Sequence, residues 1–313
     1  MSSAQPVESL ARTLVAPTPV RGLAAQGSWV RRQHPIVQVT IRIASNPMGA
    51  FGLGTLLLLL ALAAFAPLVA PYSPIQQHPG LELRPPSAQF LLGSDDLGRD
   101  LLSRILFGAR ISFVVGVMAT AIGATVGVST GMLSGYLGGW VDSVIMRFYD
   151  ALLAFPGIII GIAVISILGP SSLNVAYALS LGGMPFFARL MRSSVLSERE
   201  RDYVYAARCI GARDGRIMFG HVLPNTLAPL LVQLSLAMGF AVLAEAGLSF
   251  LGLGTQPPDP SWGSMLNDSR AYLREAPWYG LWPGIALTVL LVGLNYLSDA
   301  LRDALDPRRV NLR

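Results

Sequence analysis

Three long runs of uncharged residues set the strongest constraint on how this chain can fold. No Asp, Glu, Arg or Lys occurs in residues 43–81, 111–141 or 151–188. A membrane-spanning helix needs about 20 mostly apolar residues, so each run is long enough for at least one crossing. Only 13% of the chain is charged, about half the share of a typical soluble domain. The sequence therefore predicts an all-α integral membrane protein.

We expect six transmembrane helices. Residues 151–188 would form a single helix about 57 Å long, far longer than a bilayer is thick. The run must therefore fold back, and Gly169 to Ser172 is the natural turn. The six predicted spans are residues 48–70, 111–141, 142–168, 173–192, 224–247 and 282–300.

These spans divide the chain into five regions. Residues 1–45 form a cytoplasmic tail, with residues 1–30 disordered and an interfacial helix near Ile36–Ile43. Residues 46–72 form the first transmembrane helix. Residues 73–109 form an external segment with an amphipathic interfacial helix, capped by Ser94 or Asp95. Residues 110–302 form a five-helix core that includes a cytoplasmic loop, 197–225, and an external loop, 248–280, and residues 303–313 form a cytoplasmic tail.

The arginines orient these spans. The chain has 23 Arg and no Lys, and the six-span arrangement places 17 of the Arg in the two tails and the loops on one side, with 6 on the other. Positive residues accumulate on the cytoplasmic side of membrane proteins, so both termini and loop 197–225 are predicted to be cytoplasmic. This distribution accounts for the net charge of +5 without a nucleic-acid partner.

Several kinds of chemistry are disfavoured. A phosphate-binding Walker A loop requires a Lys, which the chain lacks. Asp95, Asp96 and Asp100 lack the Gly and distal Glu of a calcium loop, so we expect no metal site and no cofactor. No catalytic triad or zinc-protease motif occurs, which argues against an enzyme. Glu245 is expected to be hydrated at the membrane interface, with a functional role as the alternative, and few other carboxylates lie in the spans. A stand-alone secondary transporter, which would usually need them, stays the alternative.

A stripe of small residues marks the second span. Ala119, Gly123, Gly127, Gly131 and Gly135 recur every four residues and so share one helix face. In lipid, such faces let two backbones approach closely. We therefore expect this stripe to pack on a neighbouring helix, although it could instead line a transport pathway.

The cytoplasmic loop 197–225 is the one long polar stretch between spans. Ser197 and Glu200 have the spacing of a capping box, and a short helix with Tyr203, Ala206, Ala207 and Ile210 on one face is predicted to follow. Gly211 allows a sharp reversal, and a second short helix is expected over 214–220 before Leu223-Pro224 starts the next span. A short helix with small residues suits insertion into a groove on a partner, and an ordinary solvated loop is the alternative.

The order of motifs resembles one family over the chain from about Asn46 onward. Ala206, Ala207 and Gly211 followed by Leu223-Pro224 resemble the signature loop of permeases of binding-protein-dependent ABC importers, with Tyr205 where that family usually has Glu and His221 where the general pattern has Ile. The chain is most similar to the second permease of the dipeptide, oligopeptide and nickel family. The further matching segments are LLGSDDLGRDLLSRILFGARIS (91–112), GYLGGWVDSVIMRFYDALLAFP (135–156), LSFLGLGTQPPDPSWGSML (248–266) and LRDALDPR (301–308).

This resemblance implies a function and a set of partners. It implies a multi-pass permease with the type I importer fold in the bacterial cytoplasmic (inner) membrane, paired with a homologous second permease. Two ATPase subunits, which bind the ATP, would dock on loop 197–225, and an external substrate-binding protein would deliver dipeptides or oligopeptides. Nickel chelates, glutathione or sugars are the alternative cargoes. The implied coupling residues are Tyr205, Ala206, Ala207, Gly211, Asp214, His221, Leu223 and Pro224.

Overall fold

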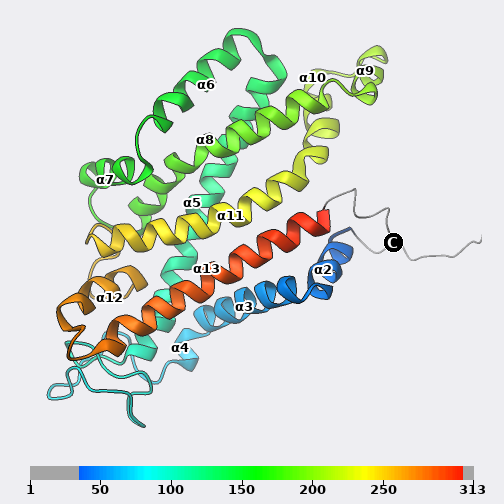
Figure 1. Ribbon diagram of the computed structural model, residues 1–313. Helices are drawn as coiled ribbons and strands as arrows, with labels where there is room; N and C mark the ends of the chain where they lie inside the picture. Colours follow the sequence, from blue (N-terminus) through cyan, green and yellow to red (C-terminus); the bar gives the residue numbers. More distant parts are fainter. Residues whose placement is uncertain (1–34, 306–313) are drawn as a thin grey trace, which may run out of the picture. The chain divides into compact units, whose positions relative to one another are not determined.

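The computed structural model describes residues 35–305, and this part of the chain is built from helices. The expected disorder of residues 1–30 and most of the C-terminal tail lie outside it. The helices are α2 (Pro35–Ser45), α3 (Pro47–Ala64), α4 (Ala66–Val69), α5 (Leu101–Leu137), α6 (Gly139–Leu153), α7 (Gly157–Leu168), α8 (Ser172–Glu198), α9 (Asp202–Cys209), α10 (Asp214–Ile217), a π-helical turn (Met218–Val222), α11 (Leu223–Phe250), α12 (Trp262–Ser269), a 3-10 turn (Arg270–Tyr272) and α13 (Pro277–Leu305) (Figure 1).

Four of the described helical segments are long and apolar enough to cross a membrane. They are α3, α5, the continuous run Asp214–Phe250, and α13, and the bent pair α6–α7 makes a fifth if it forms one span. The predicted fourth span, 173–192, lies in α8. This helix is 27 residues long, but Asn174, Arg189 and Arg192 make it less apolar than the other four.

The predicted third span, 142–168, is not a single straight helix. It divides into α6 and α7, which meet at an angle of 89°. Pro156 explains the break, because proline has no backbone N–H to donate and disfavours the helical conformation of the residue before it. Ala154 caps the end of α6, and Gly157 begins α7.

The interfacial helix expected within residues 73–109 does not form as a separate element. Residues 70–100 are irregular, and the helix begins only at Leu101, where Asp100 caps it by accepting hydrogen bonds from Ser103 N (2.8 Å) and Ser103 Oγ (2.6 Å). Leu101 and Ile105, which could form the apolar face of such a helix, therefore belong to the start of α5. The expected cap, Asp95, is instead engaged by Arg99 and Arg104.

Buried charges hold the external segment on the start of α5. Asp95 is fully buried and accepts a hydrogen bond from Arg99 Nε at 2.6 Å, while Arg104 Nε lies 3.3 Å from the same carboxylate oxygen. Asp95 Oδ1 also accepts from the backbone N–H groups of Leu97 (2.9 Å) and Arg99 (2.8 Å). Arg104 Nη1 donates to the Pro74 carbonyl at 3.1 Å. Asp95 thus binds two arginines, and within residues 35–305 no cluster of His, Cys, Asp or Glu could hold a metal ion.

The glycine stripe of α5 lies against α8. A Cβ atom on Gly127 would come within 2.5 Å of the Met184 carbonyl oxygen, and one on Gly135 within 2.8 Å of the Arg192 carbonyl oxygen. A Cβ atom on Gly131 would overlap the Ala188 carbonyl oxygen, and one on Gly123 would lie 3.2 Å from the Ser180 carbonyl oxygen of the same helix. This contact makes α8 a close neighbour of α5 over most of its length. The remaining long helices complete the bundle, with α11 against both α5 and α8, α13 against α11, and α3 against α13.

Adding one methyl group to this stripe should destabilise the subunit. In Gly131→Ala, the new Cβ would overlap the backbone of Ala188, 2.8 Å from its Cα. We expect the free energy of unfolding to fall by about 1–3 kcal/mol, seen as a lower Tm of the purified subunit in detergent. Gly54→Ala in α3 is the matched control, because its Cβ would meet nothing within 4 Å and alanine favours a helix by up to about 1 kcal/mol. A Tm for Gly131→Ala equal to or above that of Gly54→Ala would contradict the close packing.

Candidate functional site

Helix α9 is the element on which the predicted coupling residues converge. It follows the end of α8 and lies beside the C-terminal end of α5 and the start of α11 (Figure 1). The capping box predicted at Ser197 and Glu200 does not start it. α8 continues through Ser197 to Glu198, and α9 begins at Asp202 after Arg201, which has extended backbone dihedral angles.

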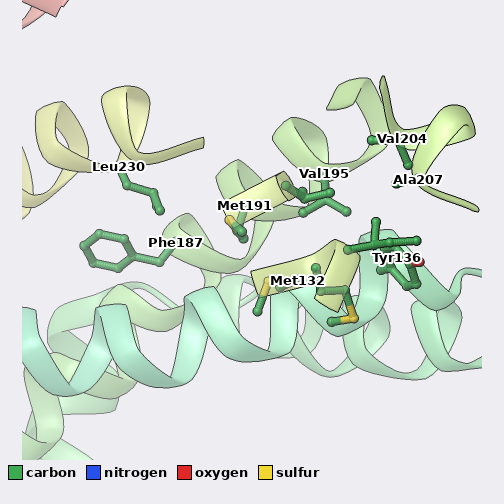
Figure 2. Packing of buried hydrophobic residues seen from close by; sticks show 11 residues of the cluster. Met132, Tyr136, Phe187, Met191, Val195, Val204, Ala207 and Leu230 are labelled. Carbon is green, nitrogen blue, oxygen red and sulfur yellow. The ribbon is translucent and has the colours of Figure 1, made fainter. Parts of the chain in front are cut away.

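One side of α9 is fixed in the protein core. Val204 is fully buried, and Ala207 is 6% exposed. Both belong to an apolar cluster with Met132, Tyr136 and Val195, and Figure 2 shows them at its outer end. Ala207 was predicted to share the face of Ala206, yet its side chain points inward. A bulky residue there would disturb the fold as well as any partner contact.

Polar interactions also join α9 and its neighbouring segments to the end of α5. Tyr136 Oη donates to Asp214 Oδ1 at 2.6 Å, which joins the end of α5 to the start of α10. The Arg208 guanidinium lies over the Tyr136 ring, 5.7 Å from its centre. Arg199 Nη1 donates to the Gly135 carbonyl at 2.9 Å, so the last turn of α5 is also tied to the end of α8. Helix α9 is therefore rigidly connected to α5.

The turn after α9 explains the need for Gly211. Its φ is +82°, a conformation that glycine adopts without steric cost. The Gly211 N–H donates to the Arg208 carbonyl at 2.9 Å, and the Ala212 N–H donates to the Ala207 carbonyl at 3.0 Å. This pair of hydrogen bonds is the Schellman motif that closes a helix. It confirms the predicted reversal at Gly211.

The other side of α9 is open to solvent and partly apolar. Ile210 is 86% exposed and Tyr205 is 51% exposed, and Ala206 and Gly211 are also exposed. We call these four residues the α9 surface. An isolated exposed apolar residue is common, but several on a short, rigidly held helix form a compact patch that a groove on another protein could cover.

The segment after α10 enters α11 without a break. The sequence predicted a restart at Leu223-Pro224, but α10, the π-helical turn and α11 form one continuous helical run, Asp214–Phe250. Within it, the Leu223 N–H bonds to the Met218 carbonyl five residues back. This wider turn lets Pro224, which has no N–H, follow without ending the helix. Leu223 packs on the buried cluster of α9, and Pro224 is exposed.

A hydrogen-bonded chain ties α9 to the first turn of α11. Tyr203 Oη donates to Glu198 at 2.6 Å, and the Asn225 amide donates to Tyr203 Oη at 3.2 Å and to the His221 carbonyl at 2.7 Å. Partial burial, followed by the hydrogen bond to Glu198, raises the pKa of Tyr203 above its usual value. The phenol thus keeps its proton and remains a donor. His221 takes part in this chain through its backbone carbonyl.

Sequence reasoning missed a second polar group, which lies near the opposite end of α11. Glu245 was expected to be hydrated, but its side chain is 1% exposed. Its carboxylate accepts hydrogen bonds from Ser249 Oγ at 2.7 Å and Ser112 Oγ at 3.2 Å. The Thr255 N–H in the external loop lies 3.4 Å from Ser249 Oγ. The i, i+4 spacing of Glu245 and Ser249 was the only sequence signal, while the partner on α5 is distant in the chain.

Comparison with known proteins agrees with this arrangement. Residues 127–311, more than half of the chain, match the family model of the binding-protein-dependent transport system inner membrane component. Residues 35–86 match the N-terminal TM domain of oligopeptide transport permease C.

Relatives and a solved structure extend the match. The dipeptide transport system permease protein DppC of Alkalihalophilus pseudofirmus is 43% identical over 85% of this chain and 88% of its own. The glutathione transport system permease protein GsiD of Salmonella typhimurium is 47% identical over 82% of this chain and 84% of its own. A chain of the inward-facing MetNI methionine ABC transporter, 17% identical, has a TM-score of 0.53 and covers 64% of this chain and 94% of that one.

The chain therefore belongs to the family of inner membrane components of binding-protein-dependent transport systems. It has the helical fold of an ABC importer permease. It is a multi-pass permease subunit of the bacterial inner membrane and is not itself an enzyme. Membership of this family implies a binding protein and an ATPase as partners.

Proposed function

We propose that this chain is one of two homologous permease subunits of an importer for dipeptides or oligopeptides, powered by two partner ATPases. The α9 surface carries the proposal, because a braced helix with exposed Ile210, Tyr205 and Ala206 suits docking on the ATPases. The peptide cargo is supported by the relatives, whose names specify dipeptides in one case and glutathione, itself a tripeptide, in the other. A binding protein outside the membrane would deliver the cargo.

We further propose six spans with both termini in the cytoplasm. In this arrangement α8 is the span that lacks a strongly apolar sequence, and α5 packs along one side of it. Six crossings return the chain to the side on which it started. The excess of arginine in loop 197–225 and in the two tails supports the cytoplasmic assignment.

The single cysteine offers a direct test of this topology. Cys209 is exposed on α9, so a membrane-impermeant maleimide should label it in inverted membrane vesicles and not in intact spheroplasts. No engineered cysteine is needed for this experiment. Added ATPase subunits should slow the labelling, because they would cover α9. Efficient labelling of intact spheroplasts would overturn the six-span topology.

Uptake by reconstituted vesicles tests the transport function. Proteoliposomes that contain both permeases, both ATPases and the external binding protein should accumulate radiolabelled dialanine only when ATP is present on the ATPase side. Vesicles with this chain alone should show none. Uptake by the chain alone would favour the stand-alone secondary transporter. Uptake of glutathione, a nickel chelate or a sugar, and not of dialanine, would reassign the cargo.

A further inference from the structure

A row of cavities follows one face of α11 from its external half to its cytoplasmic half. The three cavities have volumes of about 440, 340 and 350 Å³, each within the usual range of small-molecule sites. Phe186 and Phe240 border both the first and the second cavity, while Gln233 and Leu236 border both the second and the third. The shared residues place the three cavities next to one another along α11, and we call this row the α11 groove.

The middle cavity lies between α5, α8 and α11. Its lining is almost entirely apolar and has no charged side chain. Gly182 and Gly183 of α8 border it, and a Cβ atom on either glycine would meet nothing within 4 Å. The middle cavity is therefore open beside the backbone of α8, and its wall offers no charge to bind the ionised ends of a peptide.

Two uncharged polar groups in this cavity lack partners. Thr120 is 8% exposed, and its Oγ1 makes no hydrogen bond although it is buried. The Gln233 amide, which is partly exposed, also makes no side-chain hydrogen bond to any residue within 35–305. A buried hydroxyl without a partner costs about 1–3 kcal/mol, so a ligand that bonds to it recovers this loss. A hydroxyl and a primary amide can each donate and accept.

We propose that Thr120 and Gln233 form a transit subsite for the backbone amide of the peptide cargo. This inference rests on the proposed function and deepens it. A peptide bond presents one N–H donor and one C=O acceptor, which matches the two groups, while the apolar walls accept side chains of different shapes. The absence of charge suits a site that the cargo must leave again, because no ion pair has to be broken.

Uptake of two probes by the complete reconstituted transporter tests this subsite. The probes are dialanine and the same dipeptide methylated on its peptide nitrogen, which removes the N–H donor. The double variant Thr120→Val/Gln233→Leu removes the polar groups at nearly constant size. We expect it to take up dialanine more slowly by about 2- to 12-fold per lost hydrogen bond. It should also discriminate less than the wild type between dialanine and the methylated probe.

The ratio of dialanine uptake to methylated-probe uptake, compared between the two transporters, separates an effect of this subsite from discrimination by the binding protein. Discrimination by the binding protein is the same in both transporters, so it cancels when the two ratios are compared. Thr288→Val is the matched control, because its hydroxyl bonds within its own helix to the Gly284 carbonyl at 2.8 Å. Unchanged discrimination in an assembled double variant would overturn the subsite alone. Failure of the wild type to take up dialanine would overturn the proposed function as well.

A filling variant tests the groove by a different means. Gly182→Leu adds a side chain where the structure has open space, so the fold should be retained while the middle cavity is obstructed. We expect dialanine uptake to fall at least about tenfold. Gly54→Leu on α3, where a Cβ also meets nothing within 4 Å, should leave uptake unchanged. Normal uptake by Gly182→Leu would show that the cargo does not pass along this groove.

Discussion

Asp95→Ala should destabilise the subunit by about 3–5 kcal/mol, the usual cost of removing one partner from a buried ion pair. The variant would leave Arg99 and Arg104, which are 7% and 2% exposed, without their shared counter-charge. It would also remove the acceptor of two backbone N–H groups, those of Leu97 and Arg99. Thermal unfolding in detergent should show a markedly lower Tm, and the external segment should become sensitive to protease.

An exposed ion pair gives the matched control for this effect. Asp150 and Arg189 lie 2.6 Å apart, but their side chains are 59% and 53% exposed. Water and salt screen such a pair, so Asp150→Ala should cost about 1 kcal/mol at most. Equal losses of stability in the two variants would show that the burial of Asp95 with Arg99 and Arg104 does not contribute to stability as the structure indicates.

Ile210→Asp should abolish stable association with the ATPase subunits. The change places a carboxylate on the most exposed residue of the α9 surface, where docking would have to desolvate it. Loss of an interface anchor typically costs about 2–4 kcal/mol, which corresponds to roughly 30- to 700-fold weaker binding. Co-purification with tagged ATPase subunits, followed by titration of the purified components, measures this effect.

Two further variants separate docking from folding. Ile210→Leu keeps an apolar side chain and should bind the ATPases normally. Ala207→Trp should lose binding and stability together, because Ala207 is packed against the Tyr136 cluster. Ile210→Asp should retain the wild-type Tm, since its side chain contacts little of the subunit. Normal ATPase binding by Ile210→Asp would exclude the α9 surface as the docking element.

Short sequence patterns correctly predicted the features that depend only on residues close together in the chain. The uncharged runs located the apolar helices, and the turn at Gly169–Ser172 separates α7 from α8 as expected. The reversal at Gly211 followed from its residue type, because glycine alone adopts a positive φ freely. The placement of the glycine stripe against α8 could not be read from the spacing, which was equally consistent with a pathway-lining face.

Predictions failed where a distant partner decides the outcome. Ser94 and Asp95 looked like helix caps, but Arg104 binds Asp95 from the next helix. Ser197 and Glu200 had the spacing of a capping box, yet α8 runs through Ser197. Glu245 lay near the end of a predicted span. Its burial depends on Ser112 of α5, which donates a hydrogen bond to its carboxylate.

The continuity of α5 has a mechanical consequence. Its 37 residues contain no proline, whereas α8, α11 and α13 contain Pro185, Pro229 and Pro283 in their interiors. At 1.5 Å per residue it is about 56 Å long, and it runs from the Asp95 cluster at one end to Tyr136 beside α9 at the other. In the docking proposed here, a displacement of α9 would be transmitted along α5 to the Asp95 end of the helix, and the proline-containing helices would bend more easily.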